Sequence, residues 1–452
     1  NQEDLNSSDR VTIYTYVDPD NKDLHYDQDT KFYYPLLDMV HMYNNYCSLN
    51  KMGEYSVKVV SFSSRDRMIQ QMSTEIMAGG GPDIIILDNE LPVSKLINQG
   101  AFADMNILLK NDKSERKINL DDYDNTLMDT GVFKGKRYMM PMLIEPDIYI
   151  SNSALFKNYD LATNTRLTYS NINNKLKKFA NNSNNRSLTD SYSSSKEIIL
   201  HYINDNINKE DYTTDFETKK FKSTIESLKK LVKKSIADTK TTKDLSKSEC
   251  LLSKGTTDKE TGIYTPYNFS LSHMSGYSST QTTFTGGITE KENQSRATII
   301  CGFMINNNSN KKEKAFEFIK YSLGERMQRF ITFDSTYGDT YNITVNKDAL
   351  NNSLSSFAYG DIYNITVNKD ALNNSLSSFS YGGTDFDKIK EQDSFMDKYA
   401  SYINSINTYE IRDGYYNDEV IGSLVDDYLQ DKISIDNFIA NLNSKTKIYL
   451  YE

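Results

Sequence analysis

Residues 76–88, IMAGGGPDIIILD, narrow the choice of fold more than any other part of this sequence. Three glycines and a proline end a helical pattern, and four aliphatic residues follow without interruption. Such an aliphatic run is typical of a strand covered on both faces, as the central strands of parallel sheets are. We therefore expect a buried strand at residues 83–87.

The three glycines raise the question of a phosphate-binding loop. Such a loop follows a strand and opens a helix, whereas these glycines follow a helix and lead into a strand. The sequence also contains no GxxxxGK[ST] and no GxGxxG pattern. We interpret the glycines as a turn. Because ligands meet the carboxyl ends of strands in open α/β sheets, residues 87–90 are the expected functional end.

The flanking residues predict an alternation of strands and helices. Residues 11–16 and 55–62 carry strand patterns, and residues 35–46 carry a helical one. In residues 63–77, Ser63 and Asp66 resemble a capping box. The apolar stripe of this second helix consists of Met68, Ile69, Met72, Ile76 and Met77. The first ninety residues thus predict β-α-β-α-β, an α/β domain with a parallel sheet.

Further helical patterns continue this alternation towards the carboxyl end. They are expected at residues 93–100, at 168–181 (with Ile172, Leu176, Phe179 and Ala180 on one face), at 311–330 (with Ala315, Phe318, Ile319, Ser322 and Leu323 aligned), at 420–429 and at 435–442. Polar residues 181–195 and 240–261 are expected to form loops.

An internal repeat lies in residues 337–380. Residues 337–358 and 359–380 are nearly identical at a period of 22 residues. Two copies are too few for a solenoid, so we interpret them as a tandem duplication. Each copy predicts a short strand followed by a helix. One copy is expected to occupy a regular place in the fold and the other to be an insertion; the sequence does not decide which.

Composition excludes several classes of partner and site. A length of 452 residues suits two or three domains, and a net charge of −10 argues against nucleic-acid and anionic-membrane partners. The lysine-rich residues 219–234 read as a solvated helix face. Cys47, Cys250 and Cys301 form no CxxC, so they predict neither a disulfide framework nor a metal site, and their redox state stays open. No cofactor motif is present.

Four segments, taken in order, resemble the extracellular solute-binding proteins of ABC importers, in particular the sugar-binding, maltodextrin-binding-protein-like group. MAGGGPDIIILD is similar to that family's AGGGPDI turn, and FKGKRYMMPM with IYISNSALFKNYDL is similar to its first crossing segment. NNSNKKEKAFEFIKYSLGERMQRF resembles the turn and helix after the returning segment, and ITVNKDAL resembles L-P-V-x-K-x-A-L. Departures are Ser151-Asn152 for Tyr-Asn, and Thr344 or Thr366 for the proline of the last motif.

The resemblance implies a two-lobed, periplasmic-binding-protein-like (type II) α/β fold with a cleft between the lobes. Residues 1–143 and 300–335 would form the N-terminal lobe. Residues 147–296 and 336–452 would form the C-terminal lobe. The chain would cross near residues 141–149 and return near residues 297–306.

The resemblance also implies a mechanism and a binding site. A solute, expected to be an oligosaccharide, would contact both lobes only when they close, and the closed form would be recognised by the membrane permease. We expect the ligand contacts at strand ends and at the crossing: Tyr16, Asp18, Ser63, Arg65, Asp88, Asn89, Glu145, Tyr149, Tyr267 and Tyr277. The protein is expected to be a monomer at a bacterial cell surface, held by a lipid anchor on a segment preceding residue 1.

Other functions stay open at this stage. The sequence has 33 Tyr but no Trp. Because many sugar-binding members of the resembled family stack a tryptophan ring on their ligand, a peptide or another polar solute is an alternative. A sensor or an adhesin could use the same fold. An enzyme is disfavoured, because the four histidines show no HExxH spacing and no GxSxG is present. A calcium loop at residues 18–29 is disfavoured because Asp23 and Asp29 stand where glycine and glutamate are required.

Overall fold

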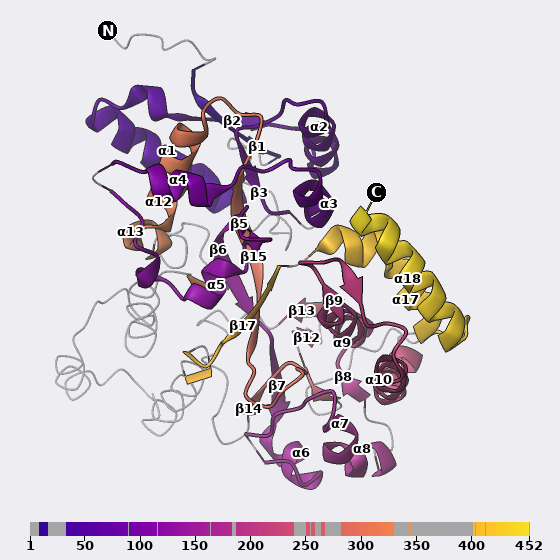
Figure 1. Ribbon diagram of the computed structural model, residues 1–452. Coiled ribbons are helices and arrows are strands. Elements are labelled where there is room, and N and C mark those ends of the chain that lie inside the picture. The colour runs from indigo at the N-terminus through magenta and orange to yellow at the C-terminus, as the bar shows by residue number, and fades with distance from the viewer. Residues whose placement is uncertain are drawn as a thin grey trace, which may run out of the picture.

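The computed structural model describes most of the chain as two groups of elements (Figure 1). The described residues are 9–16, 33–88, 90–114, 116–162, 164–182, 187–238, 250–253, 255–257, 264–266, 282–329, 343–344, 401–402, 404–411 and 413–451. Two separate clusters of buried apolar residues form the two cores. We call the elements around them the first lobe and the second lobe.

A seven-stranded sheet forms the centre of the first lobe. Its strands are β1 (Val11–Thr15), β2 (Val57–Ser61), β3 (Ile84–Ile86), β6 (Met140–Pro146), β15 (Arg296–Ile305), β16 (Ile343–Thr344) and β17 (Thr408–Ile411). The order is β16-β6-β15-β3-β1-β2, and β17 pairs with β15. β1 is parallel to both β2 and β3, so the predicted β-α-β-α-β arrangement is confirmed. All three residues of β3 are buried, as expected of a central strand.

Helices cover both sides of this sheet. Figure 1 shows α1, α4 and α12 on one side and α2 and α3 on the other. The remaining elements of the first lobe are α1 (Tyr33–Leu49), η2 (Gly53–Tyr55), α2 (Arg65–Met77), α3 (Val93–Asn98), α4 (Met105–Asn111), η3 (Leu120–Asp122), α5 (Asn125–Asp129), β4 (Val132–Phe133), β5 (Lys136–Arg137), α12 (Lys312–Leu323) and α13 (Glu325–Arg329).

The helical stripes are confirmed with two corrections. All five residues aligned on the predicted helix at 311–330 are buried in α12. In α2, however, Met77 is 61% exposed because it is the last helical residue, past the turn that faces the core. The N-cap of α2 is Ser64, whose side chain accepts from the Arg67 amide, so Ser63 is not the capping residue predicted.

The glycine turn after α2 meets a distant polar turn of the chain. Gly79 and Gly81 have φ values of +84° and +94°, conformations that glycine adopts without strain. The Asp83 carboxylate next to them accepts hydrogen bonds from the Thr12 amide (2.8 Å), the Thr12 hydroxyl (2.9 Å) and the Ser309 hydroxyl (2.6 Å). Asn306 donates to the carbonyls of Gly80 and Pro82. The GGGPD and NNNSN segments thus form one structural junction beside β1.

We expect Asp83→Ala to lower the free energy of unfolding by about 3 kcal/mol, because three donors would lose a buried ionised acceptor. Asp66→Ala is the control, since Asp66 is exposed in the first turn of α2 and should change stability by less than about 1 kcal/mol. Urea unfolding measures both values. Equal effects of the two substitutions would contradict the junction.

The second lobe is built on short strands. β7 (Ile148–Asn152) pairs antiparallel with β14 (Thr282–Gly286), and β8 (Ser187–Thr189) pairs parallel with β11 (Cys250–Leu252). Its other elements are α6 (Ser153–Asn158), α7 (Ile172–Lys175), α8 (Lys177–Asn182), α9 (Tyr192–Asp205), β9 (Ile207–Asn208), β10 (Thr213–Thr214), α10 (Lys219–Asp238), β12 (Gly255–Thr257), β13 (Tyr264–Pro266), η5 (Tyr416–Val420), α17 (Gly422–Leu429) and α18 (Ile435–Tyr451).

Several sequence predictions for the second lobe were wrong. The expected loop at 181–195 contains β8 and the start of α9, and the expected loop at 240–261 contains β11 and β12. Ile172, Leu176 and Phe179 are buried as predicted, but Ala180 is exposed because the helix breaks between α7 and α8. α18 extends nine residues beyond the predicted end at 442, to Tyr451.

Among the described residues, three parts of the chain connect the two lobes. β6 continues into β7 through Asp147, and β14 leads back to β15, whose first residue, Arg296, accepts a hydrogen bond from the Asp147 amide (3.0 Å). After β17 the chain enters the second lobe again, where α17 and α18 pack in its core. Tyr402, Ile406 and Ile411 belong to the first core, although the sequence analysis assigned residues 336–452 to the second lobe.

The duplicated segment is described at two residues. Ile343 and Thr344 form β16, which pairs with β6 at the edge of the first sheet. The other residues of 337–380 lie outside the described residues, so the prediction that one copy is an insertion stays a prediction.

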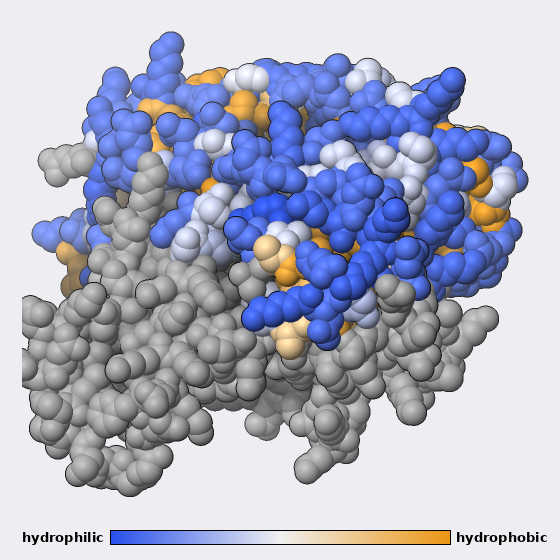
Figure 2. Space-filling model, turned by 90° about the horizontal axis from the view of Figure 1, so that it is seen from below, coloured by the Kyte–Doolittle hydropathy of each residue, from blue (hydrophilic) through white to orange (hydrophobic). Residues whose placement is uncertain are grey.

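On the face seen from below, the described part of the surface is mainly hydrophilic with small, separate apolar patches (Figure 2). This agrees with the mean hydropathy of −0.63. Among the described helices, none combines the length and the apolar character needed to cross a bilayer.

Candidate ligand-binding site

Strand directions place one edge of the first sheet towards the second lobe. β15 begins at Arg296, beside the connection between the lobes, and runs away from it. β3 is antiparallel to β15, with Ile84 opposite Ile305 and Ile86 opposite Phe303, so the carboxyl end of β3 points back towards the second lobe. β1 and β2 run parallel to β3. The ligand-binding edge expected of such a sheet therefore faces the second lobe.

A buried ion pair lies at this edge. Arg65, the first residue of α2, donates from Nη2 (2.8 Å) and Nε (3.2 Å) to the two carboxylate oxygens of Asp88. The Asp88 side chain is 2% exposed and that of Arg65 is 13% exposed. This two-point contact fixes the plane of the guanidinium group. Arg65 also lies 3.1 Å from the half-exposed Glu90, so two carboxylates surround one cation.

The structure places the other predicted site residues as follows. Tyr16 follows β1 and is half-buried against the first core. Ser63 follows β2, is exposed and contacts Arg67 at 3.4 Å. Glu145 is the one exposed residue of β6.

Tyr149 is 1% exposed inside the second core, so its ring offers no open face in this arrangement of the lobes. Asp18, Asn89, Tyr267 and Tyr277 lie outside the described residues.

Comparison with known proteins now identifies the chain. A family model described as bacterial extracellular solute-binding protein matches residues 46–357, more than half of the sequence. The chain belongs to this family of bacterial extracellular solute-binding proteins. A sequence search finds no match among curated proteins.

Solved structures support the same fold over nearly the whole solute-binding protein. The ABC substrate-binding protein Lmo0181 from Listeria monocytogenes, in complex with cycloalternan, is 14% identical with a TM-score of 0.54, covering 97% of this chain and 98% of that one. The cyclic α-maltosyl-1,6-maltose binding protein from Arthrobacter globiformis is 13% identical with a TM-score of 0.55, covering 98% of each chain.

A third structure shows that proteins of this fold also bind ligands other than sugars. UgpB from Mycobacterium tuberculosis, in complex with glycerophosphocholine, is 10% identical to this solute-binding protein with a TM-score of 0.55, covering 98% of each chain. At such low identities the likeness establishes the fold alone. The two-lobed, periplasmic-binding-protein-like fold predicted from sequence is thereby confirmed.

The second lobe of this solute-binding protein has a comparable strand edge that sequence analysis missed. Asp190 follows β8 and Ser253 follows the adjacent parallel strand β11. The Ser253 hydroxyl donates to Asp190 at 2.8 Å, and the Ser194 hydroxyl donates to the same carboxylate at 2.8 Å. Both strands are three residues long and were predicted as loops. The signal available was weak, because β8 reads SLT and β11 reads CLL, each followed by a polar residue.

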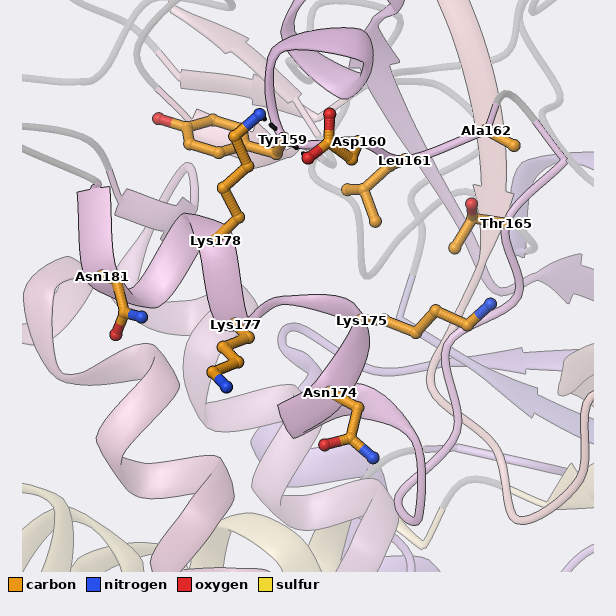
Figure 3. A pocket seen from close by; sticks show the side chains of 10 residues that line it. All are labelled: Tyr159, Asp160, Leu161, Ala162, Thr165, Asn174, Lys175, Lys177, Lys178 and Asn181. Carbon is orange, nitrogen blue, oxygen red and sulfur yellow. Dashed lines mark ion pairs between the residues drawn. The ribbon is translucent and has the colours of Figure 1, made fainter.

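A polar pocket of about 560 Å³ lies elsewhere in the second lobe (Figure 3). It is lined by residues between α6 and α8, among them Lys175, Lys177 and Lys178, and Lys178 forms an ion pair with Asp160 (2.9 Å). Figure 1 places α6, α7 and α8 at the end of the second lobe that is remote from the first. This pocket is therefore not part of the strand-edge site.

A cluster of charged residues lies where the chain connects the lobes. His201 on α9 places Nδ1 2.8 Å from Glu410 and Nε2 3.3 Å from Glu197, with Asp147 at 4.0 Å. Asp147, Glu197 and His201 are the one group in the described part of the chain with the spacing of metal ligands. Both ring nitrogens face carboxylates, so a protonated imidazole can donate to Glu410 and Glu197 at once. We interpret the group as an ion-pair cluster.

The charges of this cluster shift its pKa values in opposite directions. Burial alone lowers the pKa of His201, but the negative charge of Glu410 and hydrogen bonds to Glu197 and Glu410 outweigh it and raise the pKa to about 10. Burial alone raises the pKa of Glu410, but the His201 charge and hydrogen bond outweigh it and lower the pKa to about 2. His201 and Glu410 are therefore both charged at neutral pH.

This cluster predicts a pH-dependent stability. Because the pKa of His201 is higher in the folded than in the unfolded protein, its protonated ring stabilises the fold. This stabilisation is complete below the unfolded pKa of 6.5 and is lost as the pH rises through the folded pKa of about 10. One pKa unit corresponds to about 1.4 kcal/mol. The difference in unfolding free energy between wild type and His201→Gln should therefore be a few kcal/mol at pH 6 and shrink steadily towards pH 10. A pH-independent difference in urea unfolding would show that His201 stays neutral.

Proposed function

We propose that this protein captures a carbohydrate, and specifically an oligosaccharide, outside the cell and delivers it to the permease of an ABC importer. The solute would bind at the carboxyl ends of the first-lobe strands, near Arg65 and Asp88, and would contact the second lobe when the two lobes close. Family membership supports solute binding. The observation that favours a carbohydrate is the charge of the first-lobe edge.

Arg65 is not available as a free cation for an anionic solute. Asp88 holds it through two contacts, Glu90 lies 3.1 Å away, and Glu145 adds a further exposed carboxylate on β6. A phosphate or carboxylate ligand would therefore meet excess negative charge at the described part of this edge. Fixed, planar polar groups beside an aromatic ring such as Tyr16 suit the hydroxyl groups of a neutral sugar.

The structural neighbours agree with this choice. Of those described above, one is in complex with cycloalternan and another is a cyclic α-maltosyl-1,6-maltose binding protein. The neighbour that binds glycerophosphocholine supports the alternative of another polar solute, and an uncharged or cationic peptide would also tolerate the acidic edge. Binding without catalysis is part of the proposal, and incubation with oligosaccharides should yield no cleavage products.

Location and partners follow from the same proposal. We propose a monomer at the bacterial surface with a lipid anchor on a preceding segment, where it would meet the permease. Release of the native protein from washed cells by detergent, and not by salt, would support the anchor.

A thermal-shift screen tests the ligand class. A ligand that binds the folded state alone, at one hundred times its Kd, adds about 2.7 kcal/mol of stability, which gives a shift of several degrees. We expect a saturable rise in melting temperature with one or more α- or β-linked oligosaccharides and none with peptides or phosphate esters. A shift with peptides alone would overturn the carbohydrate proposal.

Arg65→Ala tests the location of the site. With any ligand found in the screen, we expect at least a tenfold loss of affinity by calorimetry, equivalent to about 1.4 kcal/mol, because Asp88 loses its fixed partner. Arg67→Ala is the matched control, since Arg67 lies two residues further along α2 and is exposed. Among the described residues, its side chain donates a hydrogen bond only to Ser63. Equal affinities of the two folded variants would place the site elsewhere.

A further inference from the structure

The charged cluster described above joins the two lobes directly. His201 and Asp205 lie on α9, which packs in the second core through Ile198, Ile199 and Ile203. Two of their partners lie on strands of the first sheet. Arg296 begins β15 and Glu410 lies on β17, and these two strands pair with each other. Each of these ion pairs therefore connects a helix of one lobe to a strand of the other.

Arg296 forms the most buried part of this network. Its side chain is 2% exposed and donates from Nη2 to Asp205, which also accepts from the Tyr169 hydroxyl at 2.8 Å. Its Nε and Nη1 atoms have no hydrogen-bond partner among the described residues, and Nη1 lies 3.9 Å from Glu410. Buried donors without partners are rare and costly. A small movement of α9 against β17 would change which of these donors is satisfied.

His201 provides the second connection, from a position surrounded by charge. Asp147 faces it from the link between β6 and β7, Glu197 from α9, and Glu410 from β17, while Arg296 acts on it from β15. Asp205 and Lys209 complete the charged groups that act on this cluster from the end of α9 and the residues after it. The imidazolium is thus the cation that links α9 to β17.

The connecting segments leave little room at this point. An added Cβ at Gly287 would lie 1.6 Å from the Asp147 carboxylate, and one at Gly286 would lie 2.6 Å from the Arg166 guanidinium. The carbonyl of Asp147 also accepts from the Tyr402 hydroxyl at 2.8 Å. The network therefore sits against tightly packed chain crossings, where a change of lobe angle must alter distances between its members.

We propose that His201, Arg296, Asp205 and Glu410 are positioning residues that hold the second lobe in a defined orientation to the first and so set the lobe equilibrium before a solute arrives. The inference rests on the proposed function only in its assumption that lobe orientation matters for capture. When the lobes rotate, the distance between two ion-pair partners in the same lobe stays the same. The distances between α9 and its partners on β15 and β17 change, because these partners belong to the other lobe. Removing their charge shifts the population between orientations.

The test measures the distance between the lobes without any ligand. Spin labels are attached to cysteines introduced at Lys110 on α4 and Lys230 on α10, both exposed, and the distance distribution is measured by pulsed electron paramagnetic resonance. Cys47, Cys250 and Cys301 are buried, and protein without the introduced cysteines measures their background labelling. Because no solute is needed, failure of this test and failure of the carbohydrate proposal are distinguishable.

Glu410→Gln and His201→Gln remove one charge each from the network at nearly constant volume. We expect each to move the mean interlobe distance by more than about 2 Å or to add a second population. Asp112→Asn is the matched control, because the Asp112 side chain is 7% exposed, pairs with Lys320 at 2.8 Å and lies, with its partner, wholly within the first lobe. It should lower the melting temperature and leave the distance distribution unchanged.

A pH series separates positioning from general destabilisation. Raising the pH of the wild type from 7 to about 10.5 should move its distribution towards that of His201→Gln, which should itself respond little, since the titrating ring is absent. Unchanged distributions in both folded variants would overturn the proposal. The same shift in Asp112→Asn would also overturn it, because the lobe orientation would then depend on stability alone.

Discussion

Strand β15 is the element on which the two-lobed arrangement depends. It pairs with β3 and β6 on its two sides along the first sheet and with β17 at its beginning, although these strands come from widely separated parts of the sequence. Because β15 returns from the second lobe and runs antiparallel to β3, it fixes the direction in which the first-lobe strands end. Polar residues that follow β1, β2 and β3 therefore face the other lobe, where a solute can contact both.

Long and periodic elements were predictable because burial of one face imposes a pattern on the sequence. The stripe of α12, the unbroken Ile84–Ile86 strand and the GGGPD turn were all recognised in this way. The structure adds a contact that the sequence does not reveal: Asp83 and Asn306 join the GGGPD and NNNSN turns through hydrogen bonds. The short strands β8 and β11 were missed, since three residues carry no usable period and their stability comes from tertiary contacts.

The structure shows where the site residues selected from strand ends lie, and their contact with a ligand stays a prediction. The sequence analysis selected Arg65 and Asp88, which the structure brings together as an ion pair, because both positions follow from the order of strands and helices. It also selected Tyr149, which is buried in the second core, because alternation along β7 does not tell which face of the strand is covered. The partners of His201 could not be predicted, since Arg296 and Glu410 are far away in the sequence and only the lobe connection brings them close.

Two groups of buried charges lie at different places in the same molecule. The Arg65–Asp88 pair lies at the edge that faces the second lobe and is proposed to present polar groups to a ligand. The His201 and Arg296 network lies at the connection and is proposed to hold the lobe orientation. Both are shielded from solvent, so their geometry is held more firmly than that of the exposed ion pairs of α10. Ligand capture then requires the lobe orientation to change while each lobe stays intact.

Small-angle X-ray scattering with and without a bound oligosaccharide tests this central claim most directly. Saturating ligand should lower the radius of gyration and shorten the longest interatomic distances, with scattering that fits the two unchanged lobes moved closer together. Binding of the oligosaccharide, shown by calorimetry, without any change in the scattering curve would contradict capture by lobe closure.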